Sequence, residues 1–182
     1  MATNFPGAID SFTNPSSGDT LDSPSHAAQH ANINDAMVAV QTRLGTGSDP
    51  IGTWTAFTPS WSNFNPGNAV ENWSYTIVND IMIVTGITTL GTTSSMGTAP
   101  YMLIPDSRVA ARWATGVARM REDGVATRIG NVEVSGPGDT NMNLTYWTVV
   151  SNQVRAAGIN STTPFNWGTG DYITFTIAFD IT

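Results

Sequence analysis

The sequence has 182 residues, enough for one ordinary β domain with a short appended segment and too few for two full-sized domains. Its formal net charge is -7 and it contains no lysine, which argues against a nucleic-acid partner, because tracking a phosphate backbone requires clustered basic residues. The absence of cysteine excludes disulfides, thiolate catalysis and cysteine-ligated zinc.

The polar residues of the chain are mostly uncharged: charged residues make up 12%, whereas there are 26 Thr, 15 Asn and 15 Ser. Threonine favours strands, and asparagine, together with 17 Gly and 10 Pro, favours turns. We therefore expect a mainly β fold with many short strands. The N-terminal residues resemble no signal peptide and no apolar run reaches membrane-spanning length, so we expect synthesis in the cytoplasm and no membrane partner.

Residues 1–22 are rich in Gly, Pro, Ser, Asn and Asp and are predicted to form an extended arm. Large apolar side chains are too few there to build a core. Such an arm is ordered only when something holds it, for example a docking partner or the other copies in an oligomer. Its large apolar anchors are Phe5, Ile9, Phe12 and Leu21.

A helix is predicted over residues 23–45, with Ser23 as the N-cap, Pro24 at the first helical position and Gly45 as a stop signal. The alanine-rich body between these signals favours helix. Residues 46–53 are rich in glycine and proline residues that favour a linker, and they separate the helix from the remainder of the chain.

The large side chains of this helix repeat at alternating intervals of four and three residues, which is a heptad pattern. Unbranched residues occupy the a positions and β-branched residues most d positions, an arrangement that disfavours dimers and favours trimers or tetramers. The alternative is an amphipathic helix packed on its own domain. The predicted trimer seam consists of His26, His30, Ile33, Met37, Val40 and Leu44.

His26 and His30 are the only histidines in the chain, and four-residue spacing on a helix can ligate a metal. Within one chain a zinc site would need a third ligand such as Asp19 or Asp22. In a trimer the rings would form polar layers at the axis, and these layers either set the register or hold an axial ion. We expect the plain polar layer, with the axial ion as the alternative, and we expect no cofactor elsewhere.

Residues 54–182 show the signals of about eight short strands, which predicts a jelly-roll-like antiparallel β-sandwich. Two hairpins are predicted, with turns at 79–80 and 122–124. The last strand alternates apolar and polar residues over 172–181. The predicted strands cover residues 54–61, 73–78, 81–90, 113–121, 125–134, 143–150, about 154–159 and 172–181.

The sequence shows no arrangement for catalysis: both histidines lie in the helix, and no Gly-x-Ser-x-Gly motif occurs. Of the three glutamates, Glu122 lies in a predicted turn, and Glu71 and Glu133 are far apart in the sequence. We therefore expect no enzymatic activity. The six tryptophans are interpreted first as core or intersubunit residues, and alternatively as stacking platforms for sugars. Arginines concentrate in one hairpin region, either as a solvated surface or as a contact for an acidic partner. The candidate residues for partner or glycan contact are Trp61, Trp73, Trp167, Arg119 and Arg121.

Two N-terminal runs and the helix that follows them, to Gly45, resemble the attachment module of structural proteins of tailed bacteriophages, particularly those infecting Actinobacteria. This part is about a quarter of the chain. Residues 54–105 are more loosely similar to β-rich outer domains of phage fibre and decoration proteins. The N-terminal runs are Phe5-Pro6-Gly7-Ala8-Ile9-Asp10-Ser11-Phe12-Thr13-Asn14-Pro15 and Thr20-Leu21-Asp22-Ser23-Pro24-Ser25-His26-Ala27-Ala28-Gln29-His30, and the looser motifs include Phe57-Thr58-Pro59-Ser60-Trp61 and Ile104-Pro105.

The resemblance implies a homotrimeric virion component on the particle surface, made in the host bacterium. The arm and the helical stalk would attach it to the major capsid protein or to a tail protein, and residues 54–182 would face outward. We expect a capsid decoration or head-fibre protein; the alternative is a tail-fibre or tail-tip protein that binds host-surface glycan, and a depolymerase is a third hypothesis. The residues implied in attachment are Phe5, Pro6, Ile9, Phe12 and Leu21.

Overall fold

The computed structural model describes residues 18, 20, 25–44 and 52–182, with side chains up to residue 42 in the helix. The chain divides into two compact units, residues 1–53 and residues 54–182, which are described separately. The predicted arm, including Phe5, Pro6, Ile9, Phe12 and Leu21, and most of the predicted linker lie outside the described residues.

The first unit contains one helix, α1 (His26–Leu44), which confirms the predicted helix. Its first turn is capped by Ser25, because the Ser25 hydroxyl oxygen accepts a hydrogen bond from the N–H of Ala28 at 3.4 Å. Ser23 and Pro24, the predicted start signals, lie outside the described residues. The structure thus places the cap two residues later than predicted, at the serine whose hydroxyl reaches the N–H three residues ahead.

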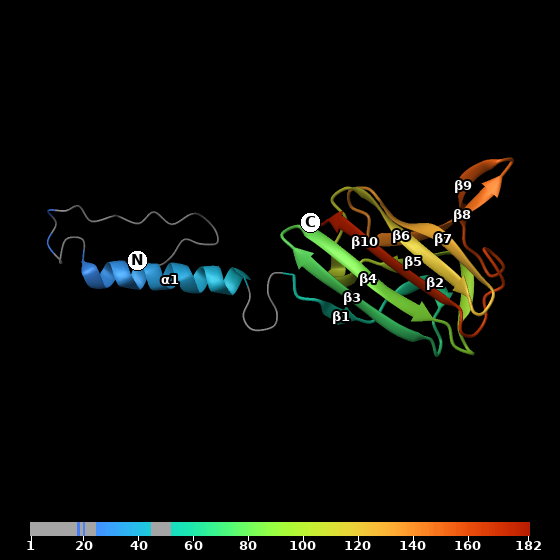
Figure 1. Ribbon diagram of the computed structural model, residues 1–182, viewed down its shortest axis with the longest axis horizontal. Coiled ribbons are helices and arrows are strands. Elements are labelled where there is room, and N and C mark those ends of the chain that lie inside the picture. The colour runs from blue at the N-terminus through green and yellow to red at the C-terminus, as the bar shows by residue number, and fades with distance from the viewer. Residues whose placement is uncertain (1–17, 19, 21–24, 45–51) are drawn as a thin grey trace. The chain divides into compact units, whose positions relative to one another are not determined.

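The second unit is mainly β, as predicted, and all its described strand pairs are antiparallel (Figure 1). One short 3₁₀ turn, η1 (Pro105–Ser107), follows the fifth strand. The strands are β1 (Thr55–Phe57), β2 (Trp61–Asn65), β3 (Val70–Val78), β4 (Ile81–Thr89), β5 (Ser95–Leu103), β6 (Trp113–Glu122), β7 (Ala126–Ser135), β8 (Asn141–Val150), β9 (Gln153–Gly158) and β10 (Tyr172–Asp180).

Both predicted hairpins are confirmed: β3 pairs with β4 across residues 79–80, and β6 pairs with β7 across 123–125. Asn79 has a φ of 56°, a left-handed conformation that asparagine adopts at low cost in a tight turn. The predicted strand 54–61 is instead two strands separated by Thr58, Pro59 and Ser60. The prediction also lacked β5, whose Gly97 and Pro100 are typical of loops rather than strands.

The strands form one continuous sheet in the order β1-β3-β4-β10-β6-β7-β8-β5-β2, with β9 paired to β8. The two end strands of this order, β1 and β2, are joined by only three residues. Such a short connection spans little more than 10 Å, so the sheet has to curl until its two ends come together. This continuous curled sheet does not confirm the predicted jelly-roll sandwich.

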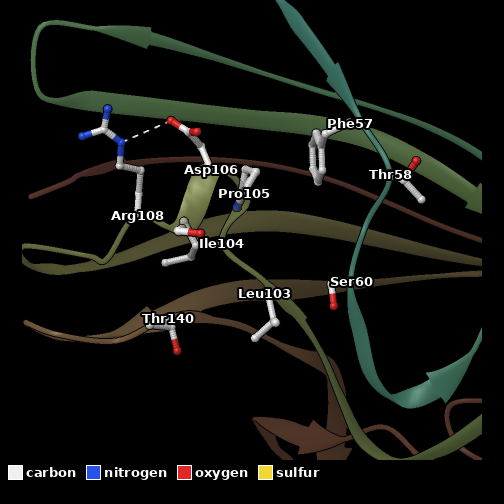
Figure 2. A pocket seen from close by; sticks show the side chains of 10 residues that line it. Phe57, Thr58, Ser60, Leu103, Ile104, Pro105, Asp106, Arg108 and Thr140 are labelled. Carbon is white, nitrogen blue, oxygen red and sulfur yellow. Dashed lines mark hydrogen bonds and ion pairs between the residues drawn. The ribbon is translucent and has the colours of Figure 1, made fainter.

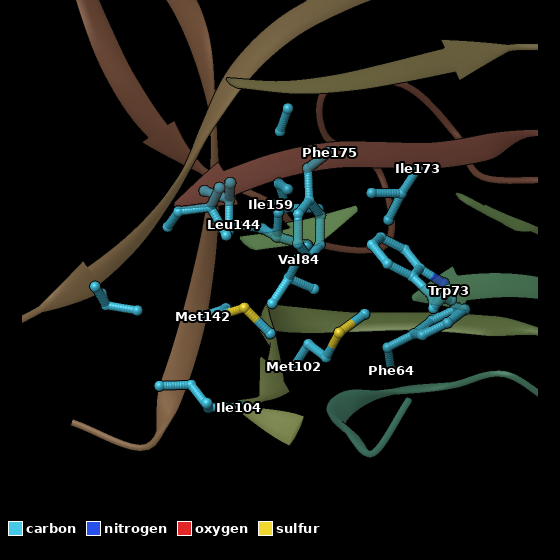
Figure 3. Close-up of a cluster of buried hydrophobic side chains, with 14 of the residues drawn as sticks. Phe64, Trp73, Val84, Met102, Ile104, Met142, Leu144, Ile159, Ile173 and Phe175 are labelled. Atoms are coloured by element: carbon cyan, nitrogen blue, oxygen red, sulfur yellow. The ribbon is translucent and has the colours of Figure 1, made fainter. Parts of the chain in front are cut away.

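The core fills the space enclosed by the curled sheet (Figure 3). Strand β10 presents alternate residues to it, and Ile173, Phe175, Ile177 and Phe179 are all buried, which confirms the alternation predicted for the last strand. The Phe175 ring lies 4.5 Å from the Trp73 ring, centroid to centroid. Methionine side chains adapt to irregular spaces, and four of them are fully buried here: Met82, Met102, Met120 and Met142.

Candidate functional site

Helix α1 carries an apolar stripe that no described residue covers well. Ile33 is 55% exposed, Met37 is 54% exposed and Val40 is 36% exposed. Their spacing of four and three residues places them on one face of the helix. The Leu44 side chain, the last predicted seam position, lies outside the described part of the chain. These three side chains therefore form an exposed apolar stripe on the described part of the helix.

His26 and His30 continue this face into the first turns of α1. Their Nε2 atoms are 3.0 Å apart, and the ring centroids are 4.5 Å apart at an interplanar angle of 65°. Both side chains are exposed. The structure brings together the two imidazoles that the spacing predicted to be neighbours, whereas Asp19 and Asp22, the candidate third ligands, lie outside the described residues.

The outer face of the sheet carries a second group of exposed apolar side chains, Val117 on β6, Ile129 on β7 and Trp147 on β8. The register pairs Val117 with Asn131 and Arg119 with Ile129, so Val117 and Ile129 are diagonal neighbours on the same face. The Trp147 indole N–H donates to Asn131 Oδ1 at 2.9 Å, and this bond holds the indole along the sheet. The three side chains thus form an apolar strip across neighbouring strands.

A basic spot adjoins this strip on β6. The guanidinium carbons of Arg119 and Arg121 lie 5.8 Å and 5.9 Å from the centre of the Tyr172 ring on β10. Neither arginine forms an ion pair with any residue that the structure describes, whereas Arg112 pairs with Asp180 at 3.2 Å. Stacking on the ring holds both cations at the surface, where they can meet an acidic group of a partner.

A groove with a volume of about 550 Å³ lies where the connection between β1 and β2 meets the end of β5 (Figure 2). Arg108 and Asp106 form an ion pair of 3.3 Å on its rim. Asp106 and Ser107 have φ angles of 60° and 53°, which fits the tight turn that carries the rim. The lining residues are Phe57, Thr58, Ser60, Leu103, Ile104, Pro105, Asp106, Ser107, Arg108 and Thr140.

The lining of this groove combines one aromatic ring with hydroxyl, carboxylate and guanidinium groups, a combination that suits a small polar ligand such as a sugar unit. Sequence reasoning missed it, because the groove is formed by three segments more than 30 residues apart from one another. The only local signal is the turn sequence Pro105-Asp106-Ser107.

Of the tryptophans proposed for glycan contact, Trp61 and Trp73 pack edge-on against each other, whereas Trp167 packs against Phe165. Trp73 is 2% exposed, so its ring belongs to the core and cannot reach an external ligand. Trp61 is half-buried and packs edge-on against Phe64. Trp167 is also half-buried, and its indole N–H donates to the carbonyl oxygen of Asn160 at 3.0 Å. The structure does not bring these three rings together with Arg119 and Arg121 into one site.

Among the described residues, no group of three or more histidine, cysteine, aspartate or glutamate side chains is placed to hold a metal ion. No helix in the described ranges has the length and apolar character needed to cross a membrane. Comparison with family models, with curated proteins and with solved structures gives no match for this chain.

Proposed function

We propose that this chain is a non-enzymatic structural protein of a tailed-bacteriophage virion. In this proposal it forms a homotrimeric capsid decoration or head-fibre spike. Residues 1–22 are the anchoring arm, the helix is a trimeric coiled-coil stalk, and residues 54–182 are a jelly-roll-like outer domain on the virion surface. The major capsid protein is the partner of the arm and stalk.

The observation that carries this proposal is the exposed apolar stripe of α1. Fully burying a side chain of the size of Ile33 or Met37 contributes about 1.5–3 kcal/mol, and a single helix of 19 residues leaves this free energy unused. Three parallel copies would bury each residue in a layer of three. The β-branched residues at 33 and 40 and the unbranched residue at 37 fit a bundle of more than two helices.

The outer face of the sheet supports the same proposal. Isolated helices of this length are marginally stable, so a trimer needs further contact between the outer domains. The strip of Val117, Ile129 and Trp147 supplies apolar surface for that contact. The neighbouring Arg119 and Arg121 would face carboxylates of the next copy, and a net charge of -7 makes such carboxylates plentiful.

Measuring the mass of the protein in solution tests the trimer. The double variant Ile33→Asp/Met37→Asp places three carboxylates in each of two seam layers and is expected to give monomers, because unpaired charges are costly to bury. The matched control, Ala31→Asp/Val38→Asp, adds the same charges at the heptad b positions outside the seam and should remain trimeric. A monomeric native protein, or a trimer that both variants leave intact, would remove the seam from the proposal.

Immunogold electron microscopy of intact virions with an antibody against residues 54–182 tests the location. Gold over the capsid supports a decoration or head-fibre protein. Gold only at the tail would instead support a tail-fibre or tail-tip protein. Virions without gold would contradict a place for this protein in the virion.

The groove in Figure 2 favours one second candidate, a tail-fibre or tail-tip protein that binds host-surface glycan. The Phe57 ring would contact a sugar face while Asp106 and Arg108 bind its hydroxyls. Removing the Asp106 carboxylate by Asp106→Ala should then abolish binding to host envelope polysaccharide. The control Asp123→Ala removes a carboxylate from the β6–β7 turn, outside the groove, and should leave binding unchanged.

A further inference from the structure

The two imidazoles at the start of α1 have the spacing that a metal ion requires. Their Nε2 atoms are 3.0 Å apart. Two nitrogen atoms that each lie 2.0–2.1 Å from one ion, at right angles, are about 2.8–3.0 Å apart. In the metal-free protein one imidazole N–H can donate to the other nitrogen across this distance, and a metal ion would replace that shared proton.

We propose that His26 and His30 form a two-histidine chelate site for a divalent transition-metal ion. Imidazole suits nickel, copper and zinc, and the observed separation matches the right-angled positions of nickel(II) and copper(II) more closely than the wider tetrahedral angle of zinc. The helix supplies the rigidity, because residues four apart lie one turn above each other.

The surroundings of the pair suit this role. Both side chains are exposed, so an ion can enter without opening the fold. The Ser25 cap defines the first turn, with the Gln29 N–H donating to the Ser25 carbonyl oxygen at 3.0 Å. The chain has no other histidine and no cysteine, so no second imidazole and no thiolate competes for the ion.

One helix supplies two ligands, and water completes the coordination in a single chain. In the trimer of the proposed function, which this step assumes, the three pairs lie around one axis and can share an ion. The number of ions per chain therefore separates the two arrangements: one per chain for separate chelates, and one per three chains for a shared axial ion.

Isothermal titration calorimetry of the full-length protein, without a histidine tag, tests the proposal with nickel chloride. We expect saturable binding, and no binding of magnesium chloride, because magnesium prefers oxygen ligands. His26→Gln and His30→Gln should each weaken nickel binding at least about tenfold, the size of loss that even an outer-shell substitution causes at a metal site. Absence of nickel binding, or equal affinity in these variants, would overturn the site.

The double variant His30→Gln/Ala31→His provides the matched control. This variant keeps two histidines but places the second one five residues after His26, where it no longer lies on the same face of the helix. Its affinity for nickel should therefore stay as low as that of His30→Gln. Affinity equal to that of the native protein would show that histidine number, not chelate geometry, decides binding, and would overturn the proposal. A solution mass measured on the same samples keeps the two proposals apart. A monomer that binds nickel contradicts the trimer alone, and a trimer that does not bind nickel contradicts the site alone.

Discussion

The Trp61 indole N–H donates to Glu71 Oε1 at 2.8 Å, and this bond joins β2, at one end of the strand order, to β3, beside the other end. The Thr88 hydroxyl donates to the same carboxylate oxygen at 3.2 Å, and the Trp73 indole N–H donates to the Thr88 oxygen at 2.8 Å. The Trp61 and Trp73 rings pack edge-on at 6.1 Å. This small network fastens the curled sheet where its two ends meet.

Glu71→Ala is expected to lower the free energy of unfolding by about 2–3 kcal/mol, because two donors in a largely buried network lose their acceptor. Urea unfolding followed by tryptophan fluorescence measures the change. Glu71→Gln keeps a carbonyl oxygen that can accept the same bonds and should lose at most about half as much. Equal stability of Glu71→Ala and the native protein would mean that packing alone closes the sheet.

Gly130→Ala should destabilise the domain by about 3 kcal/mol. A Cβ at this position would overlap with the backbone carbonyl oxygen of Thr145 on the neighbouring strand, which cannot move without breaking the pairing of β7 and β8. Gly158 is the control, since a Cβ there meets nothing within 4 Å, and Gly158→Ala should change stability by less than about 0.5 kcal/mol. Thermal unfolding compares the two variants, and a similar melting temperature for both would contradict the close approach.

Trp73→Ala is expected to cost about 3–5 kcal/mol, because its ring is 2% exposed and packs against Phe175 in the core. Trp113, which is 69% exposed, provides the comparison, and Trp113→Ala should cost only about 0.5 kcal/mol. Guanidinium unfolding of both variants measures the difference. If the two variants were equally stable, Trp73 would not be a core residue.

Asp171→Ala should cost about 2–3 kcal/mol. The carboxylate of Asp171 is buried and accepts hydrogen bonds from the backbone N–H groups of Asp123, at 2.8 Å, and Gly168, at 2.6 Å. It thereby ties the β6–β7 turn to the loop before β10. Hydrogen exchange should become faster at these two amides first, and unchanged exchange at both would contradict the role. Asp171→Asn keeps one acceptor oxygen, so one of these two amides should stay protected from hydrogen exchange.

The helix, the two hairpins and the last strand were predictable because their signals are local. In β10 the apolar residues Ile173, Phe175, Ile177 and Phe179 occupy alternate positions, and a period of two leaves no other regular structure that buries them together. The helix signal was equally local, but two serines, Ser23 and Ser25, precede the helix within three residues, and only the structure shows that Ser25 makes the capping bond.

For the candidate sites, too, some features follow from local sequence signals and others only from the structure. That His26 and His30 are close to each other follows from their four-residue spacing on a helix, whereas the 3.0 Å separation of their Nε2 atoms depends on side-chain rotamers. For Trp73 a core role was the first interpretation and glycan contact the alternative. The structure supports the core role, because Trp73 occupies one face of β3 together with Tyr75 and Ile77, at alternate positions that face inward. The trimer and the virion surface stay predictions that the experiments above decide, and the anchoring arm also stays a prediction.

The sequence by itself determined that the domain is β-rich and antiparallel at its hairpins, that one helix precedes it, and which face of that helix is apolar. Hydrophobic periodicity and turn chemistry act over a few residues, so these features are readable without knowing the fold. Tertiary structure alone decided that β1 and β2 meet at the closed ends of one sheet, that β5 is a strand despite Gly97 and Pro100, and where the groove lies. Each of these depends on pairing between distant segments, and the free energy of such pairing comes from burial and backbone hydrogen bonds that exist only once the chain has closed.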